Sequence, residues 1–258
     1  MSSIFSLIGK HALVTGAGGY LGSAMAKALA SAGATVHINA RSAESCNVLI
    51  EDIRRDGGRA DAAPFDVNNQ QQVDAFFETR GEHPIDILVN NAGSSSSVRS
   101  IAHIPVDQWD DVLNINLRAV YRLCQEFLPS MIKKQDGTII TVSSMAALNP
   151  GLLGGAAYSA AKSGVTNLMG DINAEFSNQG IRATAIMPAE VDTDILTNRP
   201  LIPDKAARST MMQPEDLAEV IYTCAALAKR TTVETIIMKP TIKRDLSADL
   251  QMAKEKIT

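Results

Sequence analysis

Thr15–Gly22 reads Thr-Gly-Ala-Gly-Gly-Tyr-Leu-Gly and joins an apolar run to a helical pattern that stops near Gly33. From Leu21 to Ala32 the apolar residues recur at helical spacing. Glycines permit a tight turn and a close approach of the backbone to a pyrophosphate, and a helix N-terminus offers free N–H groups. A strand, this turn, a helix and a second strand therefore predict a cofactor site formed by Gly16, Gly18, Gly19, Tyr20 and Leu21.

Short apolar runs alternate with longer helical patterns along the chain. The expected strands are 12–15, 35–40, 85–90, 138–143, 182–187 and 235–238, with a weaker one near 60–65. Continuous apolar runs are typical of parallel strands that are covered on both faces. The sequence predicts a Rossmann-type doubly wound parallel sheet of about seven strands, in a three-layer α/β/α arrangement. We expect one domain over 1–258, with a substrate loop near 194–212.

Composition excludes several classes of protein. The 258 residues carry a net charge of -4, which gives no reason to expect a nucleic-acid or membrane partner. Met1–Lys10 is too short for a signal peptide, and no stretch reaches the ~18 apolar residues of a spanning helix. Three scattered cysteines form no disulfide framework, and the four histidines have no ligand spacing, so no metal site is expected. These features favour a cytoplasmic location. The cysteines are Cys46, Cys124 and Cys224, and the histidines are His11, His37, His83 and His103.

The end of the second strand should select the cofactor. It reads Asn39-Ala40-Arg41-Ser42, with no carboxylate to receive a ribose 2′-hydroxyl. Arg41 can hold a 2′-phosphate, which favours NADP(H) over NAD(H), or it can be one more surface arginine. Asp66-Val67 is suited to contact with adenine, although a turn-capping aspartate fits equally well. Asn90, Ala92 and Gly93 follow the fourth strand, where the ends of parallel strands line the ligand crevice.

Tyr158 and Lys162 stand at i and i+4 of one helix, so both side chains can enter one pocket. A free tyrosine has a pKa near ~10, and a neighbouring lysine is expected to lower it toward neutrality. Ser144, at the end of the fifth strand, can donate to a substrate oxygen. Taken alone, a Tyr–Lys pair is often only a helix face. Its combination with Ser144 and the glycine turn indicates proton transfer.

These motifs resemble the short-chain dehydrogenase/reductase family of the classical type. They occur in family order from about residue 8 to residue 193: 15–22, 90–93, 114–117, 143–144, 158–162 and the region of Pro188. The resemblance implies that Tyr158 is the acid/base and that Ser144 binds the substrate oxygen. It also implies that Lys162 binds ribose, that Asn116 holds a water linked to Lys162, and that Pro188, Val191 and Thr193 lie at the nicotinamide.

Three departures from the family pattern stand out. Tyr20 replaces a small residue, and the loop then also fits the extended branch of the family, which includes nucleotide-sugar epimerases. That branch needs a large C-terminal substrate domain, and only 60 residues follow Asn198. Ala189 replaces the glycine that usually follows the proline. Lys239-Pro240-Thr241 stands where a glycine pair is common, so the packing of the C-terminal tail is open.

The sequence thus predicts an oxidoreductase that moves a hydride between NADP(H) and a carbonyl or secondary alcohol. A non-catalytic NADP(H)-binding redox sensor is the alternative, although a sensor has no need of Ser144, Tyr158 and Lys162 together. The expected partner is a small molecule, and the family resemblance implies a homodimer or homotetramer through helices that start near Val106 and Tyr158.

Overall fold

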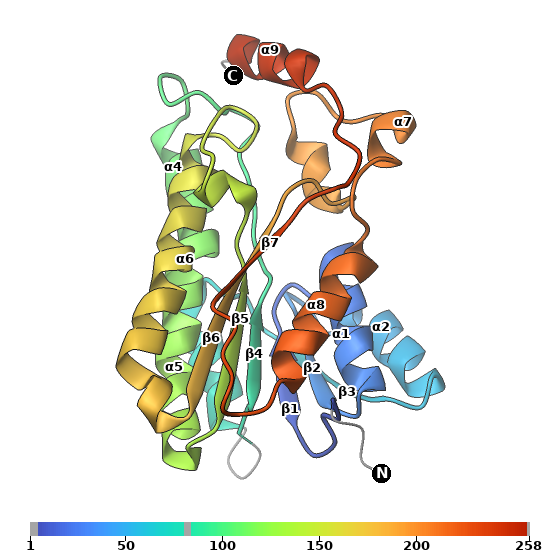
Figure 1. The fold of residues 1–258 in the computed structure, drawn as a ribbon, viewed down its shortest axis with the longest axis vertical. Coiled ribbons are helices and arrows are strands. Elements are labelled where there is room, and N and C mark those ends of the chain that lie inside the picture. Colours follow the sequence, from blue (N-terminus) through green and yellow to red (C-terminus); the bar gives the residue numbers. More distant parts are fainter. Residues whose placement is uncertain (1–4, 80–83, 257–258) are drawn as a thin grey trace.

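The computed structural model describes residues 5–79 and 84–256. His83 and the first four residues of the Met1–Lys10 segment lie outside this description. Seven parallel strands form one sheet in the order β3-β2-β1-β4-β5-β6-β7 (Figure 1). Their bounds are β1 (His11–Val14), β2 (Thr35–Ala40), β3 (Arg59–Pro64), β4 (Ile87–Asn90), β5 (Gly137–Val142), β6 (Ile181–Pro188) and β7 (Thr235–Met238). All seven expected strands are confirmed, with ends that differ by at most two residues.

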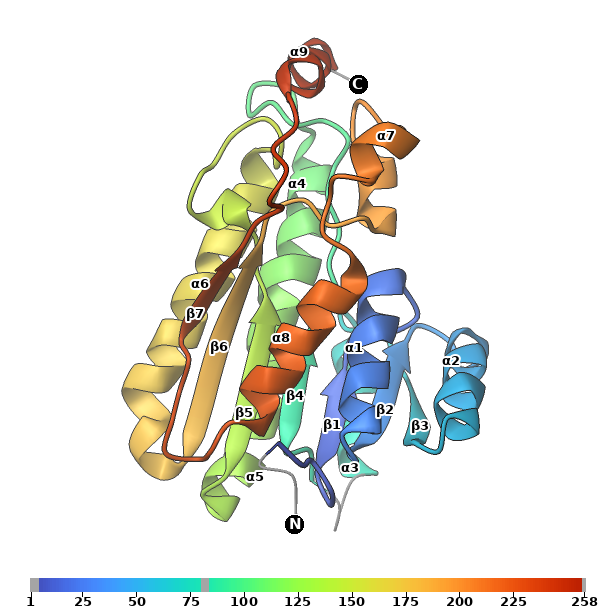
Figure 2. The same ribbon diagram turned by 45° about the vertical axis from the view of Figure 1, so that its right-hand side comes forward.

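Helices cover both faces of the sheet, as the continuous apolar strands predicted (Figure 2). One face packs against α1 (Tyr20–Ser31), α2 (Glu44–Arg55) and α8 (Pro214–Ala226). The other packs against α3 (Gln70–Glu78), α5 (Ala119–Lys134) and α6 (Ala156–Phe176). Neighbouring residues of a strand belong to opposite layers: Leu13 packs with the second group, while Ala12 and Val14 pack with the first.

The shorter elements join these layers at their edges. They are α4 (Val106–Leu113), the π-helical turn η1 (Asn114–Arg118), the 3-10 turns η2 (Met145–Ala147), η3 (Ser177–Gln179) and η4 (Asp194–Asn198), and the helices α7 (Lys205–Arg208) and α9 (Ser247–Glu255). The turn η1 lies between α4 and α5, which otherwise continue one another. A π turn widens a helix by one residue and redirects the side chains within it.

Local chemistry explains several helix ends. Gly33 and Gly180 take φ values of +99° and +78° just after α1 and η3, a conformation that glycine adopts without strain. Helix α8 begins with Pro214, and the Gln213 and Asp216 side chains cap its first turn reciprocally. The acidic residues Glu215 and Asp216 lie in the first turn of α8, at the positive end of the helix dipole.

The chain after β7 is the part that the sequence did not predict. It runs back across the carboxyl ends of the strands and ends in α9, above the sheet (Figures 1 and 2).

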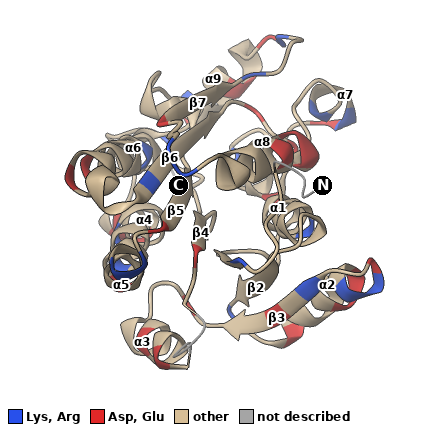
Figure 3. Cartoon of the chain, turned by 60° about the horizontal axis from the view of Figure 1, so that its bottom comes forward, with Lys and Arg blue, Asp and Glu red and all other residues tan. Residues whose placement is uncertain are grey.

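Acidic and basic residues share helices α2 and α5 (Figure 3). None of the helices in the described parts of the chain is long and apolar enough to cross a membrane.

Candidate active site

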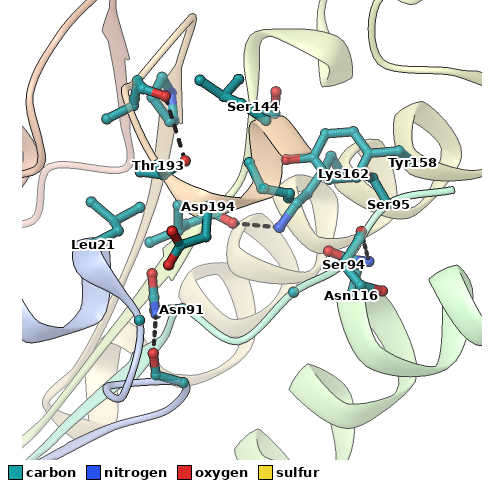
Figure 4. A pocket seen from close by; sticks show the side chains of 18 of the residues that line it. Leu21, Asn91, Ser94, Ser95, Asn116, Ser144, Tyr158, Lys162, Thr193 and Asp194 are labelled. Carbon is teal, nitrogen blue, oxygen red and sulfur yellow. Dashed lines mark hydrogen bonds between the residues drawn. The ribbon is translucent and has the colours of Figure 1, made fainter. Parts of the chain in front are cut away.

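A cavity of about 1050 Å³ lies at the carboxyl ends of the central strands. Its lining includes the turn after β1, the tips of β2 and β4, and the segments that follow β5, β6 and β7. Figure 4 shows Ser144, Tyr158 and Lys162 gathered in one part of it, with Leu21 and Asn91 in another. Open α/β sheets bind ligands at this edge, where successive crossovers leave on opposite faces.

The glycine turn is held open by close packing. Gly16 has a φ of +63°, and Gly22 lies where a Cβ would come within 2.5 Å of the Gly16 oxygen and 2.8 Å of Asn91 Nδ2. No side chain fits at either position without moving the turn. The free N–H groups at the start of α1, beside Tyr20 and Leu21, border the cavity. This cradle fits a pyrophosphate.

Two asparagines that the sequence reasoning missed shape this turn. The buried Asn39 accepts from Gly16 N at 3.3 Å and donates to the oxygens of Ala63 and Phe65. Asn91 donates from Nδ2 to Thr15 O at 2.9 Å. Both side chains tie the turn to other strands. Asn91 belongs to the motif at 90–93, but the sequence did not indicate that it or Asn39 binds the turn.

Asn90, which we expected to contact the cofactor, does not line the cavity. Its side chain points into the core and donates to Thr141 Oγ1 at 3.2 Å. Neighbouring residues of a strand face opposite sides, so Asn90 and Asn91 cannot both reach the cavity. Ala92 and Gly93 do line it, as predicted.

The part of the cavity beside the ends of β2 and β3 includes Arg41, Asp66 and Val67. Arg41 is exposed at the tip of β2, where its guanidinium is accessible to an anion. Asp66 accepts from Asn68 N at 2.9 Å, so its turn-forming role is real. Because Asp66 also lines the cavity, the two roles proposed for it are compatible.

Ser144, Tyr158 and Lys162 meet at the centre of the cavity (Figure 4). Lys162 Nζ lies 5.4 Å from the centroid of the Tyr158 ring and donates to Val142 O at 2.7 Å. Ser144 Oγ accepts from Ala146 N at 3.1 Å, which fixes the side chain at the start of η2 and leaves its own proton to donate. Such a set can hold a substrate oxygen and move a proton to or from it.

Burial raises the pKa of the Tyr158 phenol, against the opposing effects of the Ser144 hydrogen bond and the charges of Arg99 and Arg199. Burial also lowers the pKa of Lys162 to about 8. The expectation that Lys162 brings the phenol toward neutrality is therefore wrong for this structure. Desolvation, which a sequence does not display, dominates both groups.

Asn116 lies beside this centre because of the π turn η1. Its Nδ2 donates to Ser94 O and to Val112 O, both at 2.8 Å, while its buried Oδ1 has no partner among residues 5–79 and 84–256. A Cβ on Gly93 would lie 2.7 Å from that Oδ1 and 3.7 Å from Lys162 Nζ, so glycine keeps the space between them free. The unpaired oxygen suits the water that the family resemblance implies.

Pro188 at the end of β6 lines the cavity, as do Val191 and Thr193 in the segment that follows. Ala189, the departure from the family pattern, donates its N–H to Met238 O at 2.8 Å. Next to it, Glu190 forms an ion-pair network that the sequence analysis missed. Its carboxylate accepts from Arg199 Nη1 and Arg244 Nη2, both at 2.7 Å.

Arg244 also forms a bidentate pair with Asp249, at 2.8 and 2.9 Å. The network thus joins the loop after β6 to α9 through the tail, and tail residues between Lys239 and Leu246 line the cavity. The segment that replaces the family's glycine pair is consequently part of the site. In the described residues, no group of three or more His, Cys, Asp or Glu side chains is placed to hold a metal ion.

Comparisons with known proteins agree with this geometry. Residues 10–201 match the family model for short chain dehydrogenases. The chain is 30% identical over 232 residues to a 3-oxoacyl-(acyl-carrier-protein) reductase of Thermotoga maritima, which covers 85% of this chain and 92% of that protein. It is 31% identical over 214 residues to the 5-keto-D-gluconate 5-reductase of Escherichia coli K12, covering 80% of each. A gluconate 5-dehydrogenase from Burkholderia cenocepacia, solved with NADP and tartrate, superimposes with a TM-score of 0.83 at 30% identity, covering 93% of this chain and 97% of that one.

Proposed function

Because the chain belongs to the short-chain dehydrogenase/reductase family, we propose that this oxidoreductase transfers a hydride between NADP(H) and a carbonyl or secondary alcohol. One observation carries the proposal: Ser144, Tyr158 and Lys162 converge in the cavity that the glycine turn borders. The relatives named above support it, since they include reductases of carbonyl groups and a dehydrogenase solved with NADP.

The cofactor would lie along the carboxyl edge of the sheet and supply the hydride donor or acceptor. The turn Gly16–Gly22 would hold its pyrophosphate, Asp66 and Val67 its adenine, and Lys162 its nicotinamide ribose. Arg41 would pair with the 2′-phosphate through charge-assisted hydrogen bonds. Replacing Arg41 with alanine should then weaken NADPH binding more than NADH binding, and an unchanged ratio would count against this role.

Tyr158 would act as the acid and base on the substrate oxygen. In reduction, the phenol gives its proton to the carbonyl oxygen while Ser144 donates a second hydrogen bond to that oxygen. The raised pKa of Tyr158 suits a group that must carry a proton at neutral pH. In oxidation, the Ser144 bond and the nearby arginine charges stabilise the phenolate that accepts the proton.

Lys162 and Asn116 would return the proton to Tyr158. Lys162, with a pKa of about 8, can release or bind a proton near neutral pH, and Asn116 Oδ1 is free to hold a connecting water. We further propose, from the family alone, that the protein acts as a homodimer or homotetramer in the cytoplasm on a small-molecule substrate.

The decisive experiment compares Tyr158→Phe with the unchanged protein, using NADPH and a broad panel of carbonyl compounds. The phenylalanine variant should bind NADPH normally and lose nearly all turnover, because only the phenolic oxygen is removed. Ser163→Ala, on the same helix and bonded to Ala147 O, is a matched control outside the cavity lining. Normal turnover by the phenylalanine variant would refute the acid/base role, and tight NADPH binding without any turnover by the unchanged protein would favour a redox sensor.

A further inference from the structure

Arg99 is a buried cation in the wall of the cavity, and it forms no ion pair with a carboxylate of the described residues. The residue is 4% exposed. It takes part in none of the ion pairs found among residues 5–79 and 84–256. Its partners are neutral oxygens: Gly154 O at 2.6 Å, Asn198 O at 3.3 Å and Ser95 Oγ at 3.5 Å. Its buried Nε has no hydrogen-bond partner within the part of the chain that the structure describes.

A buried guanidinium without a counter-ion is costly to the fold. Burial lowers the pKa of Arg99 to about 10, so the group remains charged at neutral pH in spite of that cost. The bonds to Gly154, Asn198 and Ser95 join three loops of the cavity wall. A neutral donor such as glutamine could make bonds of this kind without burying a charge. The charge itself therefore needs a separate explanation.

Arg99 adds an unpaired positive charge to a cluster of arginines and carboxylates in the cavity wall. Arg199 lies close enough to lower the pKa of Arg99 by repulsion, but Arg199 is paired with Glu190. Arg244 is paired with Glu190 and Asp249. In this cluster three guanidiniums thus face two carboxylates. Arg99 and Arg199 both act electrostatically on the Tyr158 phenol, so the excess charge lies close to it.

From these contacts we infer that the substrate is a monoanionic keto acid or hydroxy acid whose carboxylate is received by Arg99. This inference rests on the proposed function, because it places the carboxylate in the cavity of Ser144 and Tyr158. A guanidinium fork matches the geometry of a carboxylate, and the free Nε–H is an available donor. Within the cluster of Arg99, Arg199, Arg244, Glu190 and Asp249, one substrate carboxylate would balance the remaining positive charge. The acid supplies the counter-ion that the protein itself does not.

The test uses keto acids of four to six carbons, with the carbonyl at each position, and the primary amide of each acid. With NADPH, the unchanged protein should reduce at least one acid at least tenfold better than its amide, measured by kcat/KM. Arg99→Gln should remove this preference, mainly through KM, and change kcat/KM for the amide less than threefold. Arg99→Lys should restore part of the preference, and Arg54→Gln, at a position outside the cavity lining, should leave it unchanged.

Two results would overturn the inference. One is that no acid is reduced better than its amide. The other is an equal loss of kcat/KM for acid and amide in Arg99→Gln, which would mean that Arg99 only holds the surrounding loops together. Failure of the proposed function is recognised separately, as the absence of turnover for every compound. In that case calorimetric binding of the same acids and amides to the protein with NADP decides the inference. Acids that bind no tighter than their amides would refute it, and a tenfold tighter acid whose advantage disappears in Arg99→Gln would uphold it.

Discussion

A single methyl group added at Gly22 tests the close packing of the glycine turn. In Gly22→Ala the new Cβ would lie 2.5 Å from Gly16 O, 2.7 Å from Ala17 Cα and 2.8 Å from Asn91 Nδ2. Carbon atoms do not approach oxygen or carbon so closely without displacing them. Two of the three contacts are to backbone, which cannot rotate away as a flexible side chain can. The turn itself must move.

Forced overpacking of this kind costs about 1–3 kcal/mol of folding free energy. The variant should lose about 2–4 °C in Tm for each kcal/mol, as is typical of a chain of this size. NADPH binding should weaken as well, because the displaced atoms belong to the proposed pyrophosphate site. Gly170, in the middle of α6, is the matched control, because a Cβ there meets nothing within 4 Å. Gly170→Ala should stabilise the protein by about 0.5–1 kcal/mol, since alanine restricts the unfolded chain.

The two variants are compared by thermal unfolding and by titration with NADPH followed by fluorescence. Opposite shifts in Tm, with weaker NADPH binding only in Gly22→Ala, are the expected outcome. If Gly22→Ala matched the unchanged protein in both Tm and NADPH affinity, the account of the turn given above would be wrong.

Two further predictions concern buried charge. Lys162→Met should abolish turnover and yet raise the free energy of unfolding at pH 7 by roughly 2 kcal/mol, because methionine removes a buried ammonium. The folded pKa of about 8 lies below the ordinary 10.5, so between these pH values the folded state binds fewer protons than the unfolded state, and the unchanged protein becomes more stable as pH rises. Urea unfolding at several pH values should therefore show that the difference in unfolding free energy between the variant and the unchanged protein shrinks as pH rises. A difference that stays constant with pH would contradict this. Arg244→Met should break the pairs with Glu190 and Asp249 and release α9, so that limited proteolysis cuts within 247–255 before the sheet unfolds. As a control, Arg54→Met removes an exposed ion pair and should change the free energy of unfolding by less than about 1 kcal/mol. If α9 in Arg244→Met resisted proteolysis as well as it does in the unchanged protein, the role of Arg244 would be refuted.

The sequence predicted the sheet well because the relevant signals are local. Parallel strands covered on both faces must be apolar at consecutive positions, and the run at 138–143 shows this directly. Tyr158 and Lys162 were recognisable because they share one helix face, and Ser144 because it follows a strand. Each of these relations spans a few residues of chain.

The rest of the site depends on contacts between distant segments. Glu190 and Arg244 are 54 positions apart, and the sequence around either residue does not predict that they form an ion pair. Asn90 was placed wrongly because the motif does not say which of two adjacent asparagines faces the cavity. The pKa of Tyr158 was misjudged in direction because desolvation depends on everything packed around the phenol. The π turn that carries Asn116 was likewise not predicted by any sequence pattern that we identified.

The tail between Lys239 and Leu246 lines the cavity but is synthesised after all seven strands of the sheet. The sheet is complete at Met238, when all seven strands have been made, and the glycine turn has existed since the first helix. The cavity nevertheless gains one wall, and Glu190 gains Arg244, only after a further stretch of chain has left the ribosome. A nascent chain that ends at β7 would thus contain every residue proposed for proton transfer and still lack part of the wall that encloses the substrate. The enclosed site is therefore complete only when this tail is in place.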